Sequence, residues 1–226
     1  MPVLTVVFDL DGTLVETAPD LCDTLNVILE REGRPAVPYD EARMMVGAGA
    51  RVMIERGVVA SGRAATPDEI DRMFAAFIEH YAAHIADRSH PFPGLEAALD
   101  RLAADGHILA VCTNKLEGLA RLLLDALGLT RRFAAIAGQD TYGVPKPDPT
   151  VLWKTIAAAG GDPAHAVMVG DSETDVLVAR AAGVPVIAVD FGYTEIPATE
   201  LGADRVISRF SDLPESVDAL ARRGER

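Results

Sequence analysis

The chain has 226 residues, 49% of them apolar and 24% charged, a composition that allows a buried core and excludes a disordered acidic tail. Its 21 Lys and Arg residues are outnumbered by 34 Asp and Glu residues, and the resulting formal net charge of −13 argues against nucleic acids and anionic membranes as partners, because both bind basic faces. No apolar run reaches the ~18 residues of a transmembrane helix, and no basic region precedes the short apolar stretch at the N-terminus, so we expect a cytoplasmic protein.

The first predicted element is a strand over residues 3–9, because this β-branched run ends abruptly in carboxylates and glycine, as a buried parallel strand does. Residues 15–88 follow with helical periodicity and no predicted strand. Their first helix has one apolar stripe, formed by Ala18, Leu21, Leu25, Ile28 and Leu29. Thr66, Pro67 and Glu69 open the last helix with an N-cap, a first-turn proline and a capping-box glutamate. We expect residues 15–88 to form an inserted all-helical cap, and residues 1–14 with 89–226 to form the core.

A proline- and glycine-rich connection over residues 90–94 returns the chain to the core and suits a hinge. Beyond it, apolar runs predict five more strands, at residues 107–114, 132–138, 166–172, 184–190 and near 206. Helical patterns lie between these runs, and two of them close on Gly128 and Gly183, the favoured helix stop. Strands that alternate with helices predict an α/β fold, a Rossmann-like doubly wound parallel sheet.

Four polar clusters fall at the ends of predicted strands: Asp9-Leu10-Asp11-Gly12-Thr13, Thr113-Asn114, Lys146 between Pro145 and Pro147, and Gly170-Asp171-Ser172-Glu173-Thr174-Asp175. In open α/β sheets the carboxyl ends of the strands line the crevice that binds ligands, so we expect these clusters to converge there. Each cluster alone also fits an ordinary turn or helix cap. Their convergence is therefore what indicates a functional site.

Such convergence brings together up to four carboxylates, those of Asp9, Asp11, Asp171 and Asp175, which a fold tolerates only with a compensating cation. Oxygen ligands at this density suit a hard cation, in particular Mg²⁺. Lys146 adds a second positive charge. We single it out because it is one of only three lysines in the chain and lies between prolines that stiffen its backbone. The alternative interpretation of Lys146 is a plain surface lysine.

These motifs resemble those of the haloacid dehalogenase superfamily over essentially the whole chain. The matching residues, in motif order, are Asp9, Asp11 and Thr13, then Thr113, then Lys146, then Asp171 and Asp175. The helical insertion after the first motif resembles the family's small cap. The resemblance implies an enzyme acting on small phosphate esters. A dehalogenase of this family lacks the second Asp, and a phosphonatase needs a cap lysine, whereas residues 15–88 contain none.

The resemblance also implies roles for these residues. Asp9 would be the nucleophile that becomes an aspartyl-phosphate, and Asp11 the general acid and then the base. Thr113 and Lys146 would hold the phosphoryl oxygens, where charge spreads in the transition state. The neighbouring residues expected to contact the substrate are Thr13 and Asn114.

Mg²⁺ would be bound, by the same resemblance, through the Asp9 carboxylate, the Asp11 main-chain carbonyl and the Asp171 carboxylate, with Asp175 as a further carboxylate. The expected partner is a small-molecule phosphate ester. The expected assembly is a monomer or a homodimer.

The cap is expected to choose the leaving group. Residues 46–58 and 91–115 resemble bacterial phosphoglycolate phosphatases, whose substrate carries a carboxylate besides its phosphate. The Arg51 guanidinium, or the Gly47 and Gly49 amides before the following helix, are candidates to bind that carboxylate. The alternative for Arg51 is an ordinary surface salt bridge. Two other functions stay open: a sugar-phosphate mutase or broader sugar-phosphate phosphatase of this superfamily, and a non-catalytic phosphate-responsive binding protein.

Overall fold

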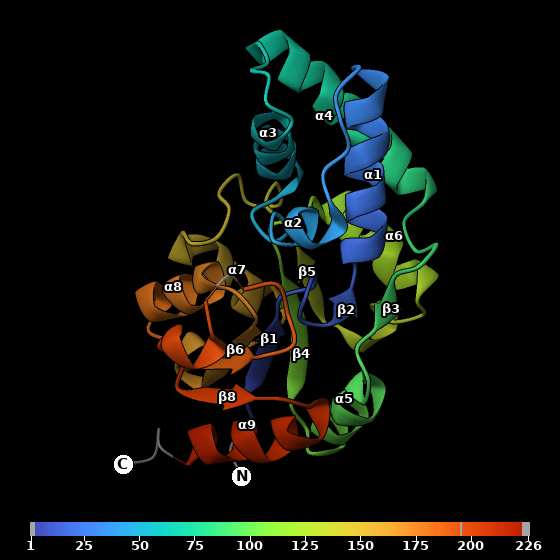
Figure 1. Cartoon of the computed structure of the whole chain (residues 1–226). Coiled ribbons are helices and arrows are strands. Elements are labelled where there is room, and N and C mark those ends of the chain that lie inside the picture. Colours follow the sequence, from blue (N-terminus) through green and yellow to red (C-terminus); the bar gives the residue numbers. More distant parts are fainter. Residues whose placement is uncertain (1–2, 195, 223–226) are drawn as a thin grey trace.

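A six-stranded parallel sheet forms the centre of the computed structural model, which describes residues 3–194 and 196–222 (Figure 1). The strands are β1 Thr5–Phe8, β4 Ile108–Cys112, β5 Ala135–Ala137, β6 Ala166–Gly170, β7 Val186–Val189 and β8 Arg205–Ile207. They lie in the order β5-β4-β1-β6-β7-β8, and every pairing is parallel. All six strands predicted from apolar runs are present, so the predicted α/β fold is confirmed.

Helices cover both faces of this sheet. They are α5 Leu95–Ala104, α6 Glu117–Ala126, α7 Pro149–Ala158, α8 Glu173–Ala182 and α9 Leu213–Ala221, with short 3-10 helices at Thr130–Arg132, Pro163–His165, Ala198–Glu200 and Phe210–Asp212. Val6 and Phe8 of β1 belong to the hydrophobic cluster that includes α5, α6 and α9, whereas Val7 belongs to the cluster that includes α7 and α8. Because successive side chains of a strand point to opposite faces, β1 is buried on both faces, and its residues after Thr5 are apolar rather than alternating.

Four further helices gather beyond one end of the sheet (Figure 1). They are α1 Ala18–Arg31, α2 Tyr39–Arg43, α3 Ala50–Ala60 and α4 Pro67–Ala83. The apolar stripe predicted for α1 is buried, and α1 packs against the other three helices. The predicted capping box of α4 is confirmed, since the Thr66 hydroxyl accepts a hydrogen bond from Glu69 N and the Glu69 carboxylate accepts one from Thr66 N. That residues 15–88 form a domain separate from the core stays a prediction.

The two connections between these helices and the sheet pair with each other. β2 (Val15–Glu16) and β3 (His90–Pro91) form a two-stranded antiparallel ribbon. The Asp20 carboxylate adds to it by accepting hydrogen bonds from the backbone N–H groups of Arg88 at 3.0 Å and Ser89 at 2.7 Å. The prediction that residues 15–88 contain no strand is therefore wrong at Val15–Glu16. So short a strand has no periodicity of its own and forms only because a distant segment lies beside it.

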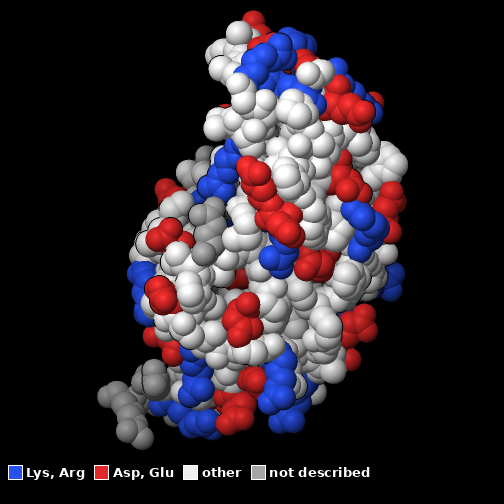
Figure 2. Space-filling view, in the orientation of Figure 1, with Lys and Arg blue, Asp and Glu red and all other residues white. Residues whose placement is uncertain are grey.

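Charged side chains of both signs are interspersed over the face of the molecule shown in Figure 2. On that face the described residues therefore spread the acidic excess of the chain among basic side chains rather than gather it in one patch. Within the described ranges 3–194 and 196–222, no helix has both the length and the apolar character needed to cross a membrane.

Candidate active site

The carboxyl ends of three adjacent strands carry the predicted site residues. Asp9, Thr113 and Asp171 each follow directly after the last residue of β1, β4 and β6, which are neighbours in the sheet. The hydrogen-bond ladder continues past the end of β1, because Asp9 N donates to Val169 O at 2.9 Å. The pairing of the strands therefore fixes the backbone positions of these three residues and brings them together at the carboxyl-end edge of the sheet.

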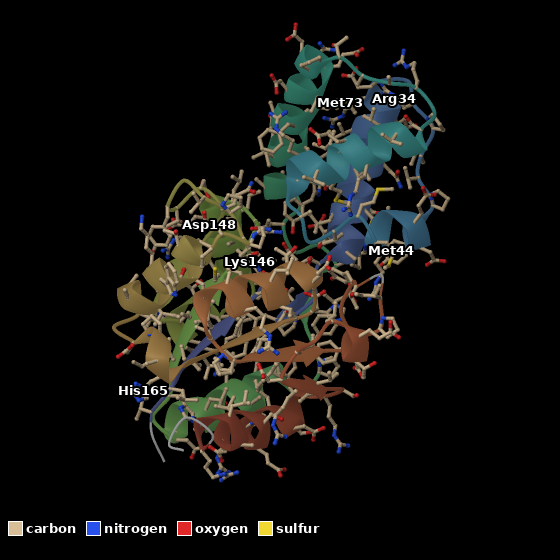
Figure 3. The ribbon with its side chains drawn as sticks, turned by 90° about the vertical axis from the view of Figure 1, so that its left-hand side faces the viewer. Arg34, Met44, Met73, Lys146, Asp148 and His165 are labelled. Carbon is tan, nitrogen blue, oxygen red and sulfur yellow. The ribbon has the colours of Figure 1, made fainter. Side chains whose placement is uncertain are left out.

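Lys146 lies between two of the carboxylates. Its Nζ donates a 2.6 Å hydrogen bond to Asp175 Oδ1 and lies 3.0 Å from Asp9 Oδ1, and all three side chains are at most 4% exposed. The Asp9 contact has an ion-pair distance without hydrogen-bond geometry, since Asp9 Oδ1 has no hydrogen-bond partner among the residues that the structure describes. Figure 3 shows Lys146 at the end of the core that faces the cap helices. The alternative of a surface lysine is wrong.

Two residues predicted to contact the substrate also hold their neighbours. Asn114 Oδ1 accepts a hydrogen bond from Lys146 N at 2.9 Å, and Asn114 Nδ2 donates to Lys146 O at 3.3 Å. The Thr13 hydroxyl donates to Asp171 Oδ1 at 3.0 Å. These hydrogen bonds position Lys146 and Asp171, and the contact of Asn114 and Thr13 with a substrate stays a prediction.

The Asp171 carboxylate is also held from its other side, by a hydrogen bond of 2.7 Å from the backbone N–H of Tyr193 to Oδ2. Gly12 packs against the same oxygen: a Cβ on Gly12 would lie 2.5 Å from Asp171 Oδ2, and the φ angle of Gly12 is +81°. Both facts require glycine at this position. Sequence reasoning missed Tyr193, although its place just beyond the polar end of a predicted strand was a usable signal.

Asp175 has a structural duty besides its contact with Lys146. Its Oδ2 accepts hydrogen bonds from Ser172 N at 3.1 Å and Ser172 Oγ at 2.7 Å, so the two residues form the capping box of α8. With Oδ1 bound to Lys146, both carboxylate oxygens have partners within the protein. The helix cap and the ammonium therefore fix this side chain together.

The acidic cluster carries more negative charge than its lysine balances. One carboxylate oxygen from each of Asp9, Asp171 and Asp175 lies within 4.8 Å of the others, and one ammonium leaves two of these three charges unmatched. Burial raises the pKa of Asp9 to about 6 against the opposing effect of Lys146, and burial with the charges of Asp175 and Asp9 raises the pKa of Asp171 to about 8. This donor set and this charge deficit fit a hard divalent cation.

Lys146 itself stays charged in this setting. Burial alone would lower the pKa of Lys146, but the carboxylates of Asp175 and Asp9 outweigh burial and raise it above its ordinary value. A permanent positive charge at the bottom of an acidic cluster is suited to an anionic ligand such as a phosphoryl group.

Lys115 is a second buried lysine of the site, and sequence reasoning did not single it out. Its Nζ donates to both oxygens of Asp11, at 2.8 and 3.0 Å, and lies 4.6 Å from the ring centre of Tyr81 on α4. Its side chain is 4% exposed. The available signal was scarcity, because Lys115 is one of three lysines and directly follows Thr113 and Asn114.

A small pocket lies between the core and the cap helices. Its volume is about 30 Å³, and residues that line it include Asp9, Asp11, Thr113 and Lys115 from the core and Gly47, Gly49, Phe77 and Tyr81 from the cap. The cap loop approaches the core closely, since a Cβ on Gly49 would lie 3.2 Å from the backbone oxygen of Asn114, and the φ angle of Gly49 is +93°. The structure therefore brings Gly47 and Gly49 to the same pocket as Asp9.

Arg51, in contrast, points away from this pocket. Its guanidinium pairs with Asp71 of α4 at 2.7 Å and lies 5.0 Å from the ring centre of Phe74. The side chain is 46% exposed. The structure therefore shows the alternative arrangement, a half-exposed salt bridge to Asp71, and does not bring Arg51 to the residues that line the pocket, so its contact with a substrate stays a prediction.

Comparison with known proteins agrees with this arrangement. A family described as "Haloacid dehalogenase-like hydrolase" matches residues 6–189 of the chain. The chain belongs to this family. In this haloacid dehalogenase-like hydrolase, the matched range includes β4, β6, all of β1 except Thr5, the cap helices and all of the acidic cluster.

Curated relatives match this hydrolase over nearly its whole length. A "Phosphoglycolate phosphatase" of Mesorhizobium japonicum is 51% identical over 96% of each chain. A second one, from Caulobacter vibrioides, is 49% identical over 96% of this chain and 91% of its own. Among solved structures, that of a predicted phosphoglycolate phosphatase from Haemophilus somnus has a TM-score of 0.89 at 29% identity, covering 95% of this chain and 97% of its own.

Proposed function

We propose that the chain is a Mg²⁺-dependent phosphatase that converts 2-phosphoglycolate to glycolate and phosphate through an aspartyl-phosphate on Asp9. The observation that supports this most is Asp9 itself, whose buried Oδ1 has no hydrogen bond within the described residues and lies 3.0 Å from the Lys146 ammonium. A carboxylate oxygen left free beside a fixed cation suits attack on an anionic phosphoryl group. The names of the relatives that match nearly the whole chain support the substrate.

In the first step a bond forms between an Asp9 oxygen and phosphorus, and the ester bond to glycolate breaks. Lys146 and Thr113, both buried beside Asp9, hold the phosphoryl oxygens while negative charge redistributes over them. The hydrogen bond from Lys146 to Asp175 keeps the ammonium aimed at this point.

The Asp9 and Asp171 carboxylates and the Asp11 main-chain carbonyl would hold Mg²⁺, with Asp175 as a further carboxylate. A bound Mg²⁺ supplies positive charge against the phosphoryl oxygens and against the acidic cluster. Thr13 and the Tyr193 backbone keep Asp171 in place for this purpose.

Asp11 acts on the leaving group and then on water. As general acid it gives a proton to the departing glycolate oxygen, and as general base it takes a proton from the water that hydrolyses the aspartyl-phosphate. Asp11 lines the same pocket as Asp9, which supports this assignment.

The shape of the pocket supports a small substrate. Its volume is about 30 Å³, and the cap contributes the first turn of α3 with Gly47 and Gly49 before it. Amide groups at a helix N-terminus suit the carboxylate of 2-phosphoglycolate. Because such a phosphorylated acid is too highly charged to cross a membrane unaided, we also propose that the enzyme works in the cytoplasm.

A phosphatase screen over small phosphorylated acids and sugars, with Mg²⁺ and with a chelator, tests the proposal. We expect 2-phosphoglycolate to give the highest kcat/KM and chelation to abolish activity. Asp9→Asn should lose turnover, whereas Asp125→Asn, on the exposed face of α6, should keep it.

The remaining candidates give different outcomes in the same screen. A mutase would isomerise a hexose 1-phosphate in the presence of a bisphosphate primer and release little phosphate. A much higher kcat/KM for a sugar phosphate than for 2-phosphoglycolate would overturn the proposed substrate. A non-catalytic binding protein would show no single turnover with any ester, and that result would overturn the enzymatic proposal.

A further inference from the structure

We propose that Lys115 recognises the carboxylate of the substrate, and that its transfer from Asp11 to that carboxylate is what frees Asp11 for proton transfer. The proposal rests on the proposed function and adds to it a residue that selects the substrate class, namely phosphate monoesters of small hydroxy acids.

The first observation is where Lys115 lies. Its ammonium is buried in the pocket, with hydrogen bonds of 2.8 and 3.0 Å to the two oxygens of Asp11 and the ring of Tyr81 at 4.6 Å. The other buried lysine, Lys146, is already engaged by Asp9 and Asp175. Among the described residues that line this pocket, Lys115 is the one with a positive side chain, so it is the candidate for a second anionic group of the substrate.

The second observation is the state in which Lys115 holds Asp11. Both Asp11 oxygens accept hydrogen bonds from one ammonium. To act as a general acid, Asp11 has to carry a proton on one of these oxygens. That O–H group would then point at an N–H group of the ammonium, and two donors cannot form a hydrogen bond with each other. Asp11 can therefore act on the leaving group only after Lys115 has given up at least one of these hydrogen bonds.

The third observation is that a second anion-favouring group faces the pocket from the cap. Helix α3 starts after Gly49 without a hydrogen bond from a capping side chain and without an acidic residue in its first turn. Gly47, Gly49 and Ala50 line the same pocket as Lys115. A carboxylate between the ammonium and this helix terminus is attracted from both sides.

The size of the pocket gives the reason for movement. At about 30 Å³ it leaves space for roughly two water molecules, so we expect an ester to displace a side chain that lines it. Among the residues that line the pocket, Lys115 has a flexible four-carbon stem, whereas the rings of Phe77 and Tyr81 are packed in the hydrophobic core. The Lys115 ammonium leaves Asp11 and forms an ion pair with the carboxylate of the substrate.

The chemical step balances with these groups and one proton from the buffered solvent. As the substrate displaces Lys115, Asp11 takes up that proton from H3O+, which becomes water, and Lys115 keeps all three of its own protons. An Asp9 oxygen then bonds to phosphorus, the ester P–O bond breaks, and the leaving oxygen takes the proton of Asp11. An ester without a second anionic group leaves Lys115 on Asp11 and reacts slowly.

The test compares 2-phosphoglycolate with 2-hydroxyethyl phosphate, which has the same length and a neutral CH2OH in place of the carboxylate. We expect the wild type to prefer 2-phosphoglycolate in kcat/KM by about 100-fold, and Lys115→Met to bring this ratio close to one. Lys154→Met, which removes the exposed lysine of α7, is the matched control and should keep the ratio. If Lys115→Met lowers both kcat/KM values by the same factor, Lys115 has only a structural role and the proposal is overturned.

A binding measurement covers the case in which Lys115→Met does not fold. Asp9→Asn and the double variant Asp9→Asn/Asp11→Asn are compared, because neither is expected to turn over the esters. With the competing Asp11 carboxylate gone, the Kd of 2-phosphoglycolate, measured calorimetrically with Mg²⁺, should tighten about 10-fold more than that of 2-hydroxyethyl phosphate. Equal changes in the two Kd values contradict the proposal. Failure of the proposed function looks different, because the wild type would then hydrolyse neither ester.

Discussion

Tyr193 connects the Asp171 carboxylate to the start of the cap. Its backbone N–H donates to Asp171 Oδ2 at 2.7 Å, and its buried side-chain hydroxyl accepts hydrogen bonds from the backbone N–H groups of Thr17 at 2.7 Å and Ala18 at 3.0 Å. The same hydroxyl donates to Glu16 at 2.7 Å. One residue thus positions a proposed metal ligand and takes the place of a side-chain cap for α1.

Tyr193→Phe removes the hydrogen bonds of the hydroxyl to Glu16, Thr17 and Ala18 and keeps the backbone hydrogen bond to Asp171. Two buried N–H groups at the start of α1 then lack an acceptor, so we expect the free energy of unfolding to fall by about 1–3 kcal/mol. The backbone bond to Asp171 remains, and the Mg²⁺ affinity should change less than 3-fold. Urea unfolding and Mg²⁺ titration measure the two effects. A large loss of Mg²⁺ affinity without loss of stability would contradict this division.

Lys146→Met leaves the carboxylates of Asp9 and Asp175 buried without their ammonium. Breaking a buried ion pair in this way is expected to cost about 3–5 kcal/mol of stability when Mg²⁺ is absent. Loss of the cation beside the phosphoryl oxygens should lower kcat by ~10²–10³-fold. Denaturant unfolding with chelator and steady-state kinetics check the two values. Lys154→Met serves as control, and a similar loss there would show that any missing lysine has this effect.

Gly12→Ala tests the close approach to Asp171. The new Cβ would lie 2.5 Å from Asp171 Oδ2 on a backbone with φ +81°, so the carboxylate must shift. We expect Mg²⁺ affinity to fall about 10–100-fold, as for other changes to groups that orient a metal ligand. Gly33→Ala is the matched control, since Gly33 has φ +65° and open space around its Cβ position. It should lose about 1 kcal/mol of stability and keep its Mg²⁺ affinity.

The raised pKa values of Asp9 and Asp171 set how stability depends on pH without metal. An ordinary Asp has a pKa of ~3.9, whereas these two have values of about 6 and about 8. The folded state therefore binds more protons than the unfolded state, and the contribution of these groups to stability is complete below pH ~4 and is lost as the pH rises through 6 and then 8.

Mg²⁺ should have the opposite dependence, because it binds the deprotonated carboxylates. We expect the increase in melting temperature on adding Mg²⁺ to be larger at pH 8 than at pH 5.5. Melting curves with Mg²⁺ and with chelator at several pH values measure it. An increase that is constant or that shrinks with pH would be incompatible with these carboxylates as the binding site.

Features that depend on neighbours in the sequence were predictable. The apolar runs gave the strands, because a strand buried on both faces needs apolar side chains at every position. Thr66 and Glu69 gave the start of α4, since both hydrogen bonds of a capping box are local. The convergence of Asp9, Thr113 and Asp171 followed from the fixed direction of parallel strands, whose carboxyl ends meet at one edge.

Features that depend on the direction of a long side chain were not predictable. Arg51 is close to the cap loop in the sequence, and Lys115 lines the same pocket as that loop in the fold. Arg51 nevertheless turns to Asp71 on α4, whereas Lys115 turns to Asp11 in the pocket. Which carboxylate each cation meets is decided by the packing of helices that are distant in sequence. The same holds for Tyr193, whose hydroxyl finds its partners only because the end of β7 lies beside the start of α1.

The ribbon of β2 and β3 allows the helices inserted between these two strands to be replaced as a unit. Entry and exit leave the sheet side by side at Val15–Glu16 and His90–Pro91, so a differently shaped insert can be grafted between these two points without rebuilding any strand of the parallel sheet. The residues that these helices present to the pocket can therefore diverge while the strand ends that carry Asp9, Thr113 and Asp171 stay in place.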